Sequence, residues 1–279
     1  MRPGAQSAAM AERMSMSRDE VLPGSARVAV HIAALAPYLA TLAALVVWEV
    51  ASGRLVNSYF VSKPSAIAVQ IYEWLATGYI QPHILSTFEV TLAGFVVAAV
   101  AAILLALVLA VNPLVDDVLT PFVYMAFSLP KIALAPLLIF WTSVGKMPPF
   151  LLAAITAFFL VFFNAYTGIR GVSPALLKSV TLMGASPLTL ALKVRLPAAA
   201  PHIVHGLCQG LIYAFHGAIV GEMTASNLGI GYVLVYAATD MDSTGVLAGL
   251  TILGIVSYAF VTAIERASNR VPGASTAAS

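Results

Sequence analysis

The feature that most constrains this chain is a series of apolar segments, each long enough to cross a lipid bilayer as a helix. A helix rises about 1.5 Å per residue, so about 20 apolar residues span the hydrocarbon core. These segments predict an all-α polytopic membrane protein with about six transmembrane helices. They lie at about 28–52, 86–111, 117–144, 147–170, 199–225 and 245–267.

The composition supports a lipid environment. Of the 279 residues, 60% are apolar and 9% are charged, whereas soluble domains carry roughly 25% charged residues. The single cysteine, Cys208, lies in an apolar segment, which predicts neither a disulfide framework nor a thiolate metal cluster. We expect a disordered cytoplasmic tail at 1–27, a transmembrane domain at 28–267 with an uncleaved first span, and a cytoplasmic tail at 268–279.

Two features interrupt the simple pattern of spans. The third segment is broken at Pro130-Lys131, and the apolar stretch 227–238 (NLGIGYVLVYAA) is too short to cross a bilayer. We interpret 227–238 as a re-entrant or interfacial piece. The break at Pro130 frees backbone carbonyl groups, and such backbone is tolerated in a membrane where it lines protein or a cavity. The segment 129–136 is therefore a candidate for a pathway or gate.

Lysine and arginine fix the expected orientation, because cytoplasmic loops carry an excess of both. If both termini and the loop 171–200 are cytoplasmic, the outside holds only Arg54, Lys63 and Lys146. Arg2, which is remote from the first span, is left out of the comparison. The inside then holds Arg13, Arg18, Arg27, Arg170, Lys178, Lys193, Arg195, Arg266 and Arg270.

The loop 171–200 begins with the signature of a short helix. Ser173 can cap free N–H groups, and Pro174 lacks a donor that the first helical position does not need. Gly184 can end the helix in a left-handed conformation. Three apolar residues recur at helical spacing and predict one docking face: Leu176, Val180 and Met183.

A second short helix is predicted directly afterwards. Ser186-Pro187 repeats the start signal and Pro197 closes the piece, so residues 184–186 form a hinge. Residues 188–196 (LTLALKVRL) also alternate with the period of a strand. A lone strand beside the bilayer would have no ladder partner, so we favour the helix. The loop could simply join two spans, or it could be a rigid knob that fits a partner.

The spacing of residues favours the knob. Gly184 is followed by Val194 nine intervening residues later, then by Arg195 and by Leu196-Pro197. This spacing resembles the cytoplasmic motif of permeases of binding-protein-dependent ABC importers, which reads EAA, three residues, Gly, nine residues, Ile, any residue, Leu-Pro. Here Lys178, Ser179 and Val180 occupy the EAA positions, so the acidic residue is absent.

Other segments carry the same resemblance over most of residues 60–265. They are SLPKIALAPLLIFWTSV at 128–144, SKPSAI at 62–67 and GAIVGEMTASNLGIGYVL at 217–234. The nearest group is the nitrate, sulfonate, taurine and pyrimidine-precursor permeases. The stretches STFEVTLAGF and GAIVGEM resemble the pyrimidine-precursor importers more than the nitrate or taurine ones, but this resemblance is weak and does not identify the solute.

The resemblance implies a permease homodimer in the bacterial inner membrane, with the pathway between the copies. A cytoplasmic ATPase would dock on 171–200, and an extracytoplasmic binding protein would deliver a small solute. ATP and Mg²⁺ belong to the ATPase, because the chain has no phosphate-binding Gly-x-x-x-x-Gly-Lys-Ser/Thr motif and is itself no enzyme. The expected coupling residues are Leu176, Leu177, Lys178, Val180, Met183, Gly184, Ala185, Ser186, Val194, Leu196 and Pro197.

Ionisable residues inside spans are costly and usually face a bundle interior or an aqueous cavity. Glu222, near the end of the fifth span, is a candidate for a structural or gate role together with Pro130 and Lys131. Glu89 lies near the edge of the second span, where an interfacial position explains it equally well.

No metal site or catalytic cluster is expected. Three histidines fall on the fifth span without an acidic or thiol ligand at suitable spacing, so structural hydrogen bonding is favoured. Two other classes stay open at this point. A secondary transporter usually shows internal repeats or paired carboxylates within spans, and an integral membrane enzyme needs catalytic groups clustered at one depth. The histidines are His202, His205 and His216.

Overall fold

The computed structural model describes residues 24–55, 57 and 60–268, and these residues form helices without a β-strand among them. The chain divides into two compact units, residues 1–65 and 66–279, which are described separately. The tail expected at 1–27 and the one at 268–279 lie almost entirely outside the described residues, as do Arg2, Arg13, Arg18 and Arg270.

The first unit contains helix α2 (Gly24–Ala51) and the turn that follows it. The indole of Trp48 donates to the Ser62 carbonyl at 3.0 Å, and the hydroxyl of Ser52 donates to the Val61 carbonyl at 2.5 Å. The carboxylate of Glu49 accepts from both the backbone N–H and the hydroxyl of Ser65. Side chains near the end of α2 thus tie the returning chain to the helix.

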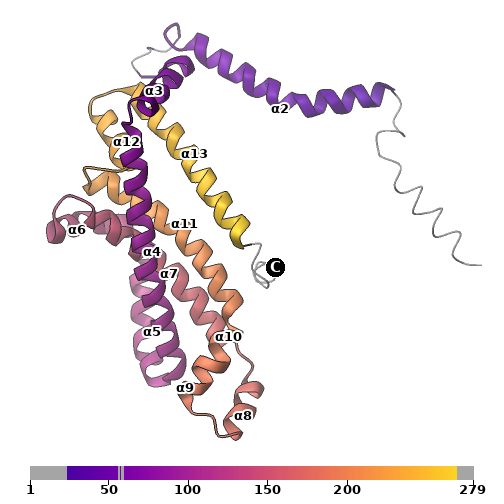
Figure 1. The fold of residues 1–279 in the computed structure, drawn as a ribbon, viewed down its shortest axis with the longest axis vertical. Coiled ribbons are helices and arrows are strands. Elements are labelled where there is room, and N and C mark those ends of the chain that lie inside the picture. The colour runs from indigo at the N-terminus through magenta and orange to yellow at the C-terminus, as the bar shows by residue number, and fades with distance from the viewer. Residues whose placement is uncertain (1–23, 56, 58–59, 269–279) are drawn as a thin grey trace, which may run out of the picture. The chain divides into compact units, whose positions relative to one another are not determined.

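The second unit is a helical bundle (Figure 1). Its long helices are α4 (Ile80–Val111), α7 (Met147–Arg170), α11 (Ala200–Ala225) and α13 (Ser243–Ser268). Its shorter helices are α3 (Pro64–Ala76), α5 (Pro113–Ser128), the 3₁₀-helix η1 (Lys131–Leu134), α6 (Ala135–Thr142), α8 (Pro174–Leu182), α9 (Pro187–Leu190), the π-helix η2 (Ala191–Arg195), α10 (Leu196–Ala198) and α12 (Ile230–Thr239).

Helices α4, α7 and α11 lie side by side and form the centre of this unit (Figure 1). Lipid gives no hydrophobic drive for helices to associate, so close packing must hold them together. Small residues make this possible: a Cβ at Gly210 would lie 2.5 Å from Val161 Cγ2, and one at Gly221 would lie 2.3 Å from Pro149 Cα. Between α4 and α7, the side chains of Ala102 and Ala106 are fully buried.

Four helical stretches in the described residues are long and apolar enough to cross a membrane, or five if α5 and η1–α6 count as one bent span. Three of the predicted segments agree closely with α7, α11 and α13. Helix α2 is 28 residues long and overlaps the predicted first segment at 28–52; its stretch Leu39–Ala51 is a shorter apolar helix by itself. The count of about six is therefore four to five in the residues described.

The bent pair is the largest departure from a simple span. Helix α5 and the η1–α6 stretch meet at 90° across Leu129-Pro130. The short helix α12 follows α11 after a break and packs back against it, since a Cβ at Gly231 would lie 2.5 Å from the Ile219 carbonyl. The sequence predicts both interruptions, at Pro130-Lys131 and at 227–238, but not the angle of the bend.

Candidate functional site

The segment 171–200 folds as two short helices joined at Gly184, as the sequence predicts. Gly184 has φ +88°, and a Cβ added there would have no other atom within 4 Å. The N–H of Ala185 donates to the Val180 carbonyl at 3.3 Å, and the N–H of Gly184 to the Thr181 carbonyl at 2.9 Å. These two bonds form a Schellman motif, which satisfies carbonyl groups at the end of α8.

Two details of the prediction are wrong. The Ser173 side chain makes no capping hydrogen bond, although Ser186 does accept one from the Thr189 N–H at 3.2 Å. Pro197 does not close the second piece, because it lies inside α10, which runs on almost directly into α11. The alternating stretch 188–196 is helical, with a π-helical turn at its centre, rather than a strand.

The turn around Gly184 carries an apolar tip. Leu182 is 90% exposed, Met183 is 84% exposed and Leu188 is 63% exposed. Such a cluster of exposed apolar side chains outside the spans is typical of an interaction site. Sequence reasoning included Met183 but missed Leu182 and Leu188, because it followed one helical face instead of the turn.

The other predicted coupling residues fall into two groups. Leu176, Lys178 and Ser186 are exposed or half-exposed beside the tip, and so are Leu177, Val180 and Ala185 in varying degree. At the far end of the segment, Leu196 packs on a core cluster formed by α4, α7 and the start of α11, while Val194 is partly buried and Pro197 is exposed. The segment 171–200 therefore has an exposed apolar tip at Leu182, Met183 and Leu188. Its other end, around Leu196, packs on the bundle and is called the root below.

Polar side chains surround that root. Asp116 on α5 is 4% exposed and binds the guanidinium of Arg170, the hydroxyl of Tyr166 at 2.8 Å and the hydroxyl of Thr120 at 2.7 Å. The guanidinium of Arg195 donates to the Ala110 carbonyl. Asp116, Arg170 and Arg195 border a hollow of about 240 Å³ that is also lined by residues of α4 and α8.

The break at Pro130 brings Lys131 against aromatic rings. Its ammonium group donates to the Phe127 carbonyl and lies 4.3 Å from the Phe127 ring centre and 5.2 Å from that of Phe159. A cation over a ring face is attracted by the ring quadrupole. Lys131 thus stabilises the bend by binding a carbonyl that the helix end leaves without an intrahelical partner.

Glu222 belongs to a separate buried cluster. The side chain is 1% exposed, and its Oε2 accepts from the Thr87 hydroxyl and from the Gly231 N–H, both at 3.0 Å. The Gly229 N–H donates to His83 Nδ1 at 3.1 Å. Gly229 has φ +117°, and a Cβ there would lie 2.0 Å from Glu222 Cδ, so only glycine fits.

The chain matches a known family of membrane proteins over most of this bundle. Residues 98–271 match the family described as "Binding-protein-dependent transport system inner membrane component". This match covers more than half of the chain. The chain belongs to that family. It is the membrane-spanning permease subunit of an ABC importer, a transport component rather than an enzyme.

Relatives of the permease agree with this assignment. A probable ABC transporter permease protein of Haemophilus influenzae is 30% identical, over 83% of this chain and 94% of its own length. The formylaminopyrimidine transport permease of Halalkalibacterium halodurans is 27% identical over 83% and 94%. A putative aliphatic sulfonates transport permease of Bacillus subtilis is 28% identical over 80% and 82%.

A solved structure supports the fold. A chain of the MetNI methionine ABC transporter in an inward-facing conformation superposes with a TM-score of 0.56 at 22% identity. The superposition covers 69% of the permease and 94% of that chain. The family assignment decides against the secondary transporter and the membrane enzyme.

Three further positions singled out in the sequence have structural contacts in the permease. Glu89 forms an exposed ion pair with Lys146 at 2.5 Å, at the end of the bundle away from the root of 171–200. His205 lies 3.1 Å from Gln209, and the His202 Cβ fills the space beside Gly168. Among the described residues, no group of three or more His, Cys, Asp and Glu side chains could hold a metal ion.

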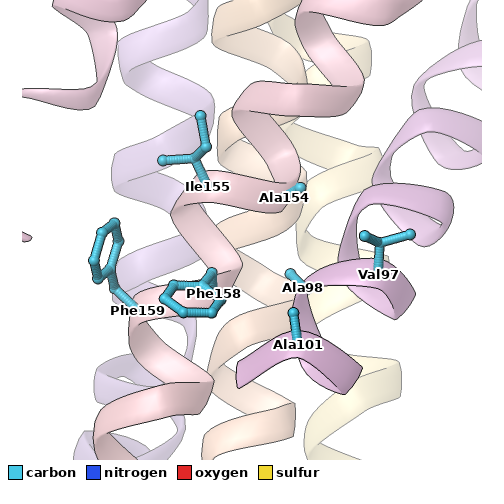
Figure 2. A pocket seen from close by; sticks show the side chains of 7 residues that line it. All are labelled: Val97, Ala98, Ala101, Ala154, Ile155, Phe158 and Phe159. Atoms are coloured by element: carbon cyan, nitrogen blue, oxygen red, sulfur yellow. The ribbon is translucent and has the colours of Figure 1, made fainter. Parts of the chain in front are cut away.

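An apolar hollow of about 250 Å³ lies between α4 and α7 (Figure 2). The hollow exists because three of the residues that line it are alanines with short side chains, namely Ala98 and Ala101 of α4 and Ala154 of α7. Its wall is wholly apolar, which suits a lipid chain or an apolar side chain of another helix. The bordering side chains are Val97, Ile155, Phe158 and Phe159.

Proposed function

We propose that the segment 171–200 docks a cytoplasmic ATPase subunit and passes its movements to the spans. The observation that carries this proposal is the apolar tip formed by Leu182, Met183 and Leu188 around the Gly184 turn. The tip is held by a short helix on each side, so it can act as a rigid knob in a groove of a partner. Leu196 connects the knob to the bundle core.

The partner ATPase would hold ATP and Mg²⁺. The permease has no Gly-x-x-x-x-Gly-Lys-Ser/Thr segment to cradle phosphates. Lys178 stands exposed where related motifs begin with an acidic residue, so the ATPase would face a positive charge there. Most of the docking contact would be apolar, so burial of Leu182, Met183 and Leu188 would supply most of the binding free energy.

The permease would act as a homodimer that receives a small solute from an extracytoplasmic binding protein. Closed twofold pairs are the commonest symmetry of oligomers, and the family takes its name from binding-protein-dependent transport. The pathway would run between the copies, next to the bend at Pro130 and Lys131. Glu222 would serve the gate indirectly, by fixing the start of α12.

The class of solute is left to the binding protein in this proposal. The relatives are named for different cargoes, among them aliphatic sulfonates and formylaminopyrimidine. In the permease, Asp116 is bonded through both carboxylate oxygens and Glu222 through Oε2, while Glu222 Oε1 is buried without a partner among the described residues. Such groups hold helices together and do not by themselves select a solute.

The docking role is tested by Gly184→Pro. Proline locks φ near −65°, so it cannot take the left-handed conformation of this turn without strain of about 1–3 kcal/mol or rearrangement of the tip. We expect the variant to insert into the membrane but to lose co-purification of the ATPase and ATP-driven uptake. Uptake at the level of the unmodified chain would contradict the docking role.

Gly184→Asn is the matched control for this experiment. Asparagine enters the left-handed region more readily than other side chains, and the space around Gly184 is open. The asparagine variant should therefore keep most ATPase capture and uptake. If both variants lose function to the same degree, the shape of the turn is not the cause.

A further inference from the structure

Both ends of the segment 171–200 are bonded to the same turn of the chain. Arg170, the last residue of α7, binds the carboxylate of Asp116 in the first turn of α5. Arg195, near the far end of the segment, donates to the carbonyl of Ala110 in the last turn of α4. The turn at Asn112 connects these two positions, so two arginines hold the α4–α5 junction from either side of the segment.

The bonds to Asp116 are directional, and its carboxylate is buried, whereas the Arg170 side chain is 56% exposed. Asp116 Oδ1 accepts from Thr120 at 2.7 Å and from Tyr166 at 2.8 Å, while Oδ2 accepts from Arg170. Arg170 also donates to the Tyr166 hydroxyl at 2.6 Å. Charge-assisted hydrogen bonds are roughly twice as strong as neutral ones, and removing one partner leaves a buried charge uncompensated.

Farther along α5, the contacts with α7 are of another kind. The rings of Tyr124 and Phe163 lie 4.9 Å apart, and those of Phe127 and Phe163 lie 5.0 Å apart. Ring contacts of this kind hold two helices together in a preferred packing geometry, but they carry no charge and no hydrogen bond. The Asp116 cluster is therefore the charged, hydrogen-bonded contact between α5 and α7, and the bend itself also rests on α7 through Lys131 and the Phe159 ring.

Helix α5 leads directly to the break. It runs from Pro113 to Ser128 and is followed by Leu129-Pro130 and the 90° bend. Pro121 removes one intrahelical hydrogen bond inside α5, but the helix continues without a break from Pro113 to Ser128. A displacement of its first turn can therefore be passed along it to the bend. If the segment 171–200 is moved, the movement would pass from its root through Asp116 and α5 to the bend at Pro130, which is the predicted gate.

We propose that Asp116 is the positioning residue through which movement of the segment 171–200 reaches α5 and the bend at Pro130. This inference rests on the proposed function, because it assumes that an ATPase moves the segment. It adds a defined connection, the Asp116–Arg170–Tyr166 cluster with Arg195 on Ala110, between the docking site and the gate.

A labelling experiment on the permease–ATPase complex in lipid nanodiscs tests the connection. The native Cys208 is replaced by alanine, and Ala133→Cys on η1, where the side chain is exposed, reports on the bend. The rate of maleimide labelling is measured without nucleotide and with ATP plus vanadate. We expect a several-fold difference between the two states, and we expect Asp116→Asn and Arg170→Gln to abolish it.

The control is a second ion pair, Glu89–Lys146, which joins α4 to the residue before α7. Glu89→Gln removes the attraction to Lys146, but that pair is 59% and 48% exposed and lies at the opposite end of the bundle. The Glu89→Gln complex should keep the full nucleotide response. A loss of response in this control equal to that of Asp116→Asn would overturn the specific role of Asp116.

The outcomes separate the two proposals. A nucleotide response that persists in Asp116→Asn and Arg170→Gln overturns this inference and leaves ATPase docking intact. No response in the chain with Asp116 unchanged overturns the proposal that ATPase movements reach the bend and, with it, the connection; ATPase docking itself is tested by co-purification with Gly184→Pro. If the charge variants do not assemble, Tyr166→Phe removes one donor and keeps both charges: a reduced response supports the connection, and an unchanged one overturns it.

Discussion

At the start of α12, three consecutive backbone N–H groups bond to side chains of other helices. Gly229 donates to His83, Ile230 to the Thr87 hydroxyl at 3.0 Å and Gly231 to Glu222. The first N–H groups of any helix lack an intrahelical partner, and within a bilayer no water satisfies them. Glu222, His83 and Thr87 together replace a local N-cap.

The loss of Glu222 should therefore destabilise α12. Glu222→Ala leaves the Gly231 N–H and the Thr87 hydroxyl without this acceptor, at a cost of about 1–3 kcal/mol. Glu222→Gln keeps a carbonyl oxygen at the same place and should cost less. Thermal unfolding of the purified permease in detergent measures the order. Equal losses for alanine and glutamine would show that the acceptor oxygen is not what matters.

This cluster marks a limit of sequence reasoning at the residue scale. Glu222 stands out because a carboxylate inside an apolar segment is costly. Its partner Thr87 is 135 positions away along the chain, and no local spacing links the two. His83 and its neighbours look like polar residues outside a span, so the sequence predicts that the second segment begins at 86, whereas α4 begins at Ile80.

At the scale of elements, the contact between α7 and α11 depends on glycine. Gly206, Gly210, Gly217 and Gly221 recur along α11 where it meets α7, and a Cβ at any of them would lie within 2.6 Å of an α7 atom. Without a hydrophobic drive in lipid, helix association relies on this close approach and on the van der Waals contact that it permits.

Gly221→Ala tests that contact. The added methyl group would meet the backbone of Pro149, which cannot rotate away, so the helices must separate locally at a cost of about 1–3 kcal/mol. Thermal unfolding of the purified permease should show a lower transition temperature. Gly254→Ala on α13 is the control, because nothing lies within 4 Å of its Cβ and alanine favours a helix by about 0.5–1 kcal/mol.

Sequence-based prediction works better for elements that composition alone decides. The bounds of α7 follow from an apolar segment between Lys146 and Arg170, and α13 follows in the same way. The 90° bend could not be predicted, because Pro130 predicts a break but not its direction. The direction depends on tertiary contacts, such as those of Lys131 with the rings of Phe127 and Phe159.

At the scale of the whole chain, the second unit has two chemically distinct ends. One end carries Lys146 together with the carboxylate of Glu89, and there the Gly145 N–H donates to the Ala225 carbonyl at 2.9 Å. The other end carries Arg170 and Arg195. Because lysine and arginine accumulate on the cytoplasmic side, the end with Arg170 is predicted to be cytoplasmic.

Cysteine labelling decides this orientation. In a Cys208→Ala background, Leu182→Cys places a thiol on the exposed tip and Asp240→Cys places one after α12, at an exposed position near the opposite end. We expect a membrane-impermeant maleimide to label Asp240→Cys in intact cells. Leu182→Cys should be labelled only after the cells are permeabilised.

The result bears on every other proposal, because ATP is available only inside the cell. A tip labelled from outside could not meet an ATPase, whatever its shape, and the apolar cluster at Leu182 and Met183 would then need another partner. If the tip is labelled from inside and Asp240 from outside, the binding protein would dock at the end that carries Glu89 and Lys146. Orientation thus assigns each partner to one end of the molecule before any partner is identified.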